Sequence, residues 1–120
     1  MRKTLLAVAA LLLAALSLTA CGGDDSGGSA GGSSATSVDI TIKDGKVSPN
    51  GDRVKASVGE PITLHIDADV DGEIHVHSTP EQEIEFTKGT STKKLTIDKP
   101  GIVDVEDHAL EQVIVQLEVS

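Results

Sequence analysis

The chain has 120 residues, with 19 Asp and Glu against ten Lys and Arg, and its formal net charge is −9 at pH 7. Two of the basic residues, Arg2 and Lys3, belong to an N-terminal leader, so we expect a mature net charge of −11. Such a charge repels nucleic acid and anionic lipid, which disfavours nucleic-acid binding and favours cationic partners or simply solubility.

Residues 1–20 have the features of a secretory leader. A positive start is followed by an apolar run from Leu5 to Leu16, and small residues then precede Cys21, the only cysteine of the chain. This arrangement resembles the lipobox of bacterial lipoproteins, which implies that Cys21 becomes the first mature residue and carries lipid. Acyl chains would then anchor an extracytoplasmic domain to the bacterial cell membrane. A retained transmembrane span of about 20 apolar residues is the weaker interpretation.

The next segment, residues 21–37, predicts a flexible linker behind the lipidated cysteine. It consists mainly of Gly, Ser, Ala and Thr with two Asp, and it has no large apolar side chain to bury. Segments of this composition behave as random coils with a root-mean-square span of roughly 5 to 6 Å times the square root of the residue count. The remaining residues, 38–120, are enough for one small domain and too few for two.

Short stretches of alternating polar and apolar residues fill this domain and predict β-strands. In chain order they cover residues 38–42, 53–58, 62–68, 73–77 and 83–86, a strand containing Leu95 and Ile97, and then 102–106 and 113–119. Turn residues such as Asp44-Gly45, Asn50-Gly51 and Pro100-Gly101 separate them. No sustained helical period occurs outside the leader. The pattern predicts an all-β sandwich of about seven or eight strands with a core of Val, Ile and Leu and one aromatic residue, Phe86.

The histidine-bearing stretch Glu73-Ile74-His75-Val76-His77 is the main candidate site. Strand alternation places Glu73, His75 and His77 on one face. The two histidine Cα atoms would lie roughly 6.6 Å apart, at about 3.3 Å per residue, so both imidazoles can converge on one ion. A solvated strand face with two chance histidines is the alternative.

The orientation of this strand is also open. If Ile74 and Val76 face the core, both histidines point outward, and this is the commoner arrangement; the reverse would bury them and require hydrogen-bond partners. His65, which alternates with apolar residues on another strand, is expected to be an exposed residue without a ligand role.

Two further motifs carry a resemblance to a known family. Val58-Gly59-Glu60-Pro61-Ile62-Thr63-Leu64 and Asp98-Lys99-Pro100-Gly101-Ile102-Val103, together with the histidine strand, resemble the cupredoxins, a family of Greek-key β-sandwiches. The resemblance covers nearly all of 38–120. Related domains occur in envelope proteins tied to copper or iron handling. The resemblance implies a cupredoxin-like Greek-key sandwich in which His75 corresponds to the first copper histidine and His108 lies in the loop that carries the other ligands.

The sulfur ligands of a blue-copper centre are missing from this sequence. No cysteine follows Cys21 and no methionine follows Met1, so electron transfer of the plastocyanin kind is not expected. The predicted metal ligands are His75, His77 and His108, with Glu73 as a weaker candidate and Glu106 and Asp107 close in sequence. Imidazole suits copper(II), zinc and nickel, and copper(II) is the first choice. Because neutral imidazole is the ligand, metal binding should weaken as the pH falls through about 6.5.

Two functions follow from the sequence. The first is an envelope lipoprotein that binds copper(II) or a similar ion through these histidines, for metal handling. The second is a metal-free β-sandwich that binds an envelope protein partner and has no cofactor. A catalytic role is not expected, because the chain has no nucleophile set, phosphate-binding glycine loop or cofactor motif.

Overall fold

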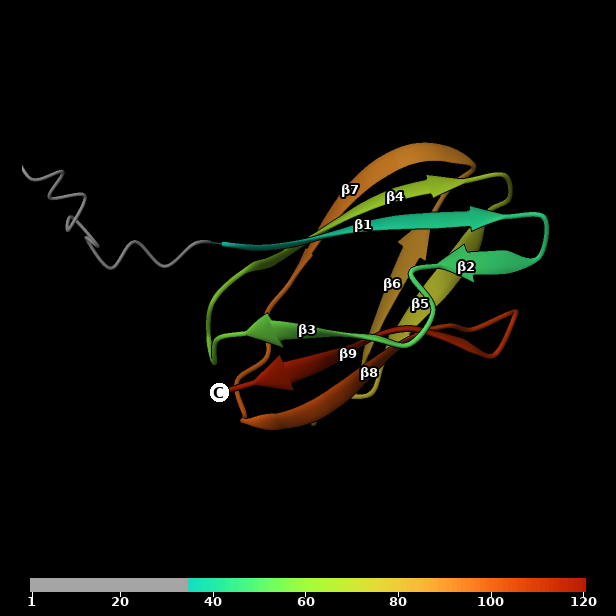
Figure 1. Cartoon of the computed structure of the whole chain (residues 1–120). Coiled ribbons are helices and arrows are strands. Elements are labelled where there is room, and N and C mark those ends of the chain that lie inside the picture. Colours follow the sequence, from blue (N-terminus) through green and yellow to red (C-terminus); the bar gives the residue numbers. More distant parts are fainter. Residues whose placement is uncertain (1–34) are drawn as a thin grey trace, which may run out of the picture. The chain divides into compact units, whose positions relative to one another are not determined.

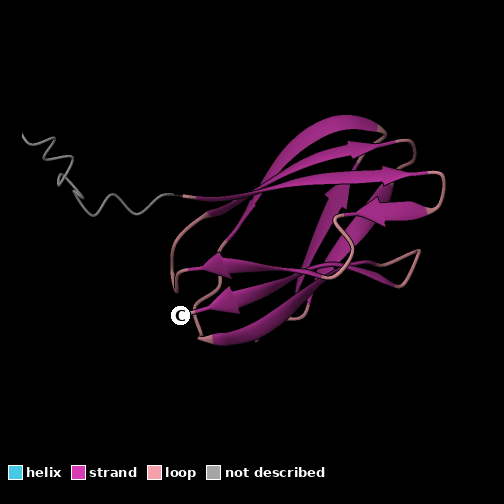
Figure 2. Ribbon diagram, in the orientation of Figure 1, coloured by secondary structure: helices cyan, strands magenta, loops and turns pink. Residues whose placement is uncertain are grey.

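The computed structural model of the chain describes residues 35–120, and the leader, Cys21 and most of the predicted linker lie outside them. Within this part the chain forms nine strands and no helix (Figures 1 and 2). They are β1 (Thr36–Lys43), β2 (Lys46–Ser48), β3 (Asp52–Ala56), β4 (Ile62–Ala68), β5 (Gly72–Val76), β6 (Gln82–Phe86), β7 (Gly89–Leu95), β8 (Gly101–Asp107) and β9 (Gln112–Val119). No helix in the described part is long and apolar enough to cross a bilayer.

The strands form two sheets that face each other (Figure 1). One sheet has the order β2-β1-β4-β7, and the other has the order β3-β9-β8-β5-β6. The pairs β1 with β4 and β3 with β9 are parallel, whereas the other neighbours are antiparallel. The predicted all-β sandwich is therefore confirmed, with nine strands in place of seven or eight.

Apolar residues from both sheets fill the space between the sheets, as their alternation predicts. Ile66 on β4 and Val105 on β8 are among the side chains with almost no exposed surface, and Phe86 is 3% exposed. Removing this apolar area from water is the main force that holds the sheets together, at roughly 25 cal/mol per Å². The strand residues that alternate with these core residues point to solvent, so polar and charged side chains can occupy their positions.

Gly72 is required where β5 begins. A Cβ atom at this position would lie 2.5 Å from Cζ of Phe86, which is closer than real Cβ contacts allow. The ring of Phe86, on the neighbouring strand β6, therefore packs directly over the backbone of Gly72. This contact fixes the start of β5 and, with it, the positions of the residues that follow.

Several local predictions differ from the structure, among them the strand expected to contain both Leu95 and Ile97, which ends at Leu95. The short strand β2, predicted as part of a turn, pairs with β1. The strand predicted to reach Val58 ends at Ala56, and Val58 is 40% exposed because the chain is already turning toward β4. On β9, the alternation of Val113, Val115, Leu117 and Val119 predicts that Ile114 points away from the core, but Ile114 is fully buried beside Val115. A β-bulge in the pairing of β8 with β9 gives β9 an extra residue and turns both side chains inward.

Candidate metal site on the outer face of the five-stranded sheet

The predicted strand 73–77 corresponds to β5, which lies between β6 and β8 in the five-stranded sheet. β5 ends at Val76, so His77 follows directly after it. Ile74 and Val76 are fully buried, whereas the side chains of His75 and His77 are 21% and 39% exposed. The apolar residues thus point into the sandwich and the histidines point outward. Of the two orientations left open by the sequence, the structure has the outward one.

The two imidazoles lie next to each other, as the alternation predicts. Their ring centroids are 4.6 Å apart and the ring planes are inclined by 34°. His108, in the turn between β8 and β9, lies on the other side of His75, with the ring centroids 5.9 Å apart. His75 is therefore the central histidine of the three.

Glu81, from the connection between β5 and β6, places its carboxylate against both imidazoles. Its Oε2 atom lies 3.0 Å from Nε2 of His75, and its Oε1 atom lies 3.7 Å from Nδ1 of His77. Strand alternation does not point to Glu81, because it lies between two strands. Its signal was the position four residues after His77 and directly after Pro80, where a turn brings the chain back toward the strand it has left.

Glu106 on β8 interacts with the other nitrogen of His77. Its Oε2 atom lies 3.1 Å from Nε2 of His77. The ring of His77 consequently has a carboxylate at each nitrogen. Only the contact with Glu106 is at hydrogen-bonding distance, so Nδ1 of His77 has a carboxylate nearby but is not hydrogen-bonded to it. The lone pair of that nitrogen can therefore be directed at an ion.

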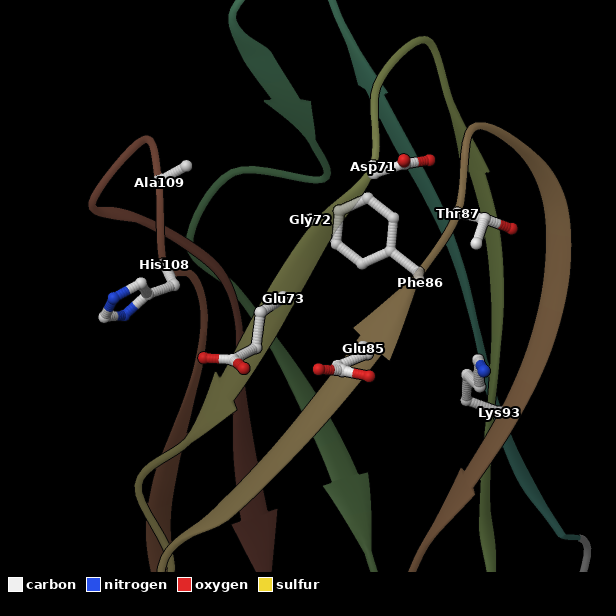
Figure 3. A pocket seen from close by; sticks show the side chains of 9 residues that line it. All are labelled: Asp71, Gly72, Glu73, Glu85, Phe86, Thr87, Lys93, His108 and Ala109. Carbon is white, nitrogen blue, oxygen red and sulfur yellow. The ribbon is translucent and has the colours of Figure 1, made fainter.

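The remaining predicted residues lie apart from this group. Glu73 lies opposite Glu85 in the pairing of β5 with β6, and both line an open hollow of about 610 Å³. Figure 3 shows these two side chains next to each other, with His108 beyond Glu73 and Lys93 on the far side of the hollow. Asp107 is 2% exposed, and its Oδ1 accepts a hydrogen bond from the backbone N–H of Leu110 at 2.8 Å. Asp107 therefore stabilises the turn and does not reach the imidazoles.

His65 lies on β4 in the other sheet. It is exposed as predicted, and its Nδ1 is 3.3 Å from Oγ1 of Thr92. No carboxylate contact to this imidazole occurs among the ion pairs of residues 35–120.

The candidate ligand atoms of this group are nitrogen and oxygen, which suits a metal site of the non-blue type. Thiolate and thioether ligands are absent from residues 35–120. Two ligand atoms that each lie about 2.0 to 2.1 Å from one ion are roughly 2.9 to 3.4 Å apart, and the His75–Glu81 separation of 3.0 Å falls in this range. As the side chains stand, however, no group of three or more His, Cys, Asp or Glu residues in the described part is arranged to hold an ion. Small rotations of the exposed side chains would be needed to complete the site.

Comparison with solved structures gives the class of fold. An amicyanin mutant in its Cu(I) form matches with a TM-score of 0.52 and 13% sequence identity, over 70% of this chain and 82% of that one. A purple cupredoxin from Nitrosopumilus maritimus matches with a TM-score of 0.51 and 15% identity, over 71% of this chain and 99% of that one.

The domain thus has a cupredoxin-like β-sandwich fold, as the sequence resemblance predicted. At these identities the comparison shows the fold alone. No protein-family model matches the chain, and no curated protein matches it.

Proposed function

We propose that this protein is a membrane-anchored envelope lipoprotein whose cupredoxin-like domain binds copper(II) or a similar divalent ion for metal handling. The anchor would be lipid on Cys21. The ion would be bound on the outer face of the five-stranded sheet by His75 and His77, with a carboxylate oxygen of Glu81. The proposed role is binding, and catalysis is not part of it.

One observation carries the metal proposal, which is that the carboxylate of Glu81 approaches both imidazoles while Glu106 approaches the opposite side of His77. Histidines that bind metals usually donate their other ring N–H to a carboxylate, which fixes the ring and its tautomer. Glu106 would have this orienting role at Nε2 of His77, leaving the lone pair of Nδ1 for the ion.

His108 would lie at the margin of this site. It is close to His75 but on the side away from Glu81, so we assign it a role in the approach or exchange of the ion. The moderate exposure of the site favours exchange as well, because a partly open coordination sphere allows an ion to enter and leave. Copper(II) remains the first choice, since imidazole ligands bind it more tightly than the neighbouring divalent ions.

Isothermal titration of the purified protein with copper(II) tests the metal proposal. We expect one ion per chain, displaced by a chelator. Absence of binding with a Kd below about 1 mM, which corresponds to about −4.1 kcal/mol, would overturn it. A partner protein that co-purifies equally well with and without chelator would instead favour the metal-free interaction module.

Replacing Cys21 by Ser tests the anchor separately. We expect the unaltered protein to incorporate labelled fatty acid and the Cys21→Ser protein to incorporate none, because the thiol that would carry the acyl chain is gone. Equal incorporation by the two proteins would contradict lipid attachment at Cys21.

A further inference from the structure

The side chain of Glu81 is more exposed than those of His75, His77 and Glu106, yet Glu81 is the residue that approaches both imidazoles. Its side chain is 60% exposed, and it lies in the connection between β5 and β6, outside both strands. An exposed glutamate in a connecting segment ordinarily samples several rotamers and loses entropy when it is held in one geometry. Its position beside His75 and His77 therefore needs support from the residues around it.

Two neighbours of Glu81 provide such support. The hydroxyl of Ser78, a residue only 8% exposed, donates a hydrogen bond to the backbone carbonyl of Pro80 at 2.6 Å. The side-chain amide of Gln82 donates to Oγ of Ser78 at 3.1 Å. The connection is thus closed by hydrogen bonds directly before and after Glu81.

Gln82 also links this connection to the other sheet. Its amide nitrogen donates a hydrogen bond to the backbone carbonyl of Thr96 at 3.0 Å, just beyond the end of β7. Glu81 directly precedes Gln82 in the chain, so holding the Gln82 side chain in place limits the positions that the backbone of Glu81 can take. Gln82 pairs with Val76, whose side chain is fully buried, which places its own side chain on the inner side of the sheet edge.

We propose that Gln82, through its hydrogen bonds to Ser78 and Thr96, is a positioning residue that holds Glu81 as a carboxylate ligand of the metal site. This inference rests on the proposed metal-binding function and adds a ligand-positioning device to it. Gln82 does not touch the ion. Its effect on affinity acts entirely through Glu81, and this makes it separable by experiment from a general effect on folding.

The test is a double-mutant cycle on copper(II) affinity, measured by isothermal titration of the purified protein. Glu81→Gln removes the charged ligand, and Gln82→Met removes both amide hydrogen bonds with little change in volume. Residues that orient metal ligands typically contribute about 10- to 100-fold to affinity, so we expect each single variant to bind copper(II) about tenfold more weakly. The double variant should bind no more than about twofold more weakly than Glu81→Gln alone, because Gln82 then has no ligand to position.

Gln112→Met is the matched control. Gln112 is likewise partly buried and bonds across to the β1–β2 hairpin, through Gly45 and Val47, but it has no contact with the connection that holds Glu81. We expect its copper(II) affinity to stay within about twofold of the unaltered protein, the range of a distant substitution.

Electron paramagnetic resonance of the copper(II) forms adds a second readout. If Gln82 acts through Glu81, the Gln82→Met and Glu81→Gln proteins should show the same altered spectrum. Two outcomes would overturn the positioning role while leaving metal binding intact. In the first, the affinity loss of the double variant equals the product of the two single losses. In the second, the Gln82→Met protein keeps the affinity and spectrum of the unaltered protein. Failure of the unaltered protein to bind copper(II) would overturn the proposed function, and this inference with it.

Discussion

The outer faces of the two sheets carry histidines in similar sequence settings but in different surroundings. His65 on β4 and His75 on β5 each alternate with fully buried apolar residues, and each points outward. His65 has a threonine hydroxyl as its side-chain partner. His75 has a second imidazole and a glutamate.

The difference comes from the segments next to each strand. β4 is flanked by β1 and β7, whose residues level with His65 are Asp39 and Thr92. β5 is flanked by β6 and β8, and the residues level with His75 are Glu83 and Glu106, while the β5–β6 connection adds Glu81. A carboxylate level with a histidine is therefore not enough, since Asp39 forms no ion pair with His65 within residues 35–120; His75 differs because Glu81 reaches its ring from the β5–β6 connection.

Removing His75 together with His77, which follows the end of β5, should have the largest effect on copper(II) affinity. We expect His75→Ala/His77→Ala to abolish copper(II) binding, a loss of more than about 100-fold, because both nitrogen ligands are gone. His65→Ala is the matched control on the other sheet and should bind as the unaltered protein does. Titration calorimetry measures all three proteins, and equal losses in the two variants would show that the faces do not differ.

Copper(II) should also stabilise the fold through the β5 face alone. A ligand at 100 times its Kd that binds only the folded state raises the free energy of unfolding by about 2.7 kcal/mol. We expect this increase in thermal or urea unfolding of the unaltered protein and of His65→Ala. The increase should vanish in His75→Ala/His77→Ala and after chelator is added. Stabilisation of the double variant would place the bound ion elsewhere on the chain.

Two glutamates next to His75 should differ in their effect on affinity. Glu106→Gln removes the carboxylate that orients His77, so we expect copper(II) affinity to fall by about tenfold. Glu83 lies directly opposite His75 on β6 but makes no side-chain hydrogen bond or ion pair within residues 35–120. Glu83→Gln should therefore change the affinity by less than about twofold. Similar losses in both variants would indicate a general effect of negative charge.

The smallest effect is expected for an ion pair on the outer face of the four-stranded sheet, measured as a change in the free energy of unfolding. Lys43 and Asp67 form an ion pair there, and both side chains are nearly half exposed. Such surface pairs contribute about 0 to 1 kcal/mol, and salt screens them. A double-mutant cycle with Lys43→Met and Asp67→Asn, read from urea unfolding, should give a coupling free energy in this range that decreases at high salt. Neither variant should alter copper(II) affinity. A change in affinity would show that this ion pair on the four-stranded sheet influences metal binding on the five-stranded sheet.

The alternation of residue types was enough to predict the sandwich, the outward side of Ile62–Ala68 and the adjacency of His75 and His77. Strand period depends only on backbone geometry, and burial of Val, Ile and Leu selects which face points inward. The same local information failed at Ile114. A bulge depends on the pairing of two strands, which one strand's own pattern does not contain.

The sequence by itself determined that the described domain is all-β and that His75 and His77 lie next to each other on one face, in a domain without sulfur ligands. Only the tertiary structure decided which carboxylates surround these two histidines. Glu81 reaches His75 through the β5–β6 connection, and Glu106 reaches His77 because β8 pairs with β5, although 29 positions separate the two residues in the chain. Contacts of this kind depend on strand order and register, which are set by packing of the whole core and not by any short stretch of residues.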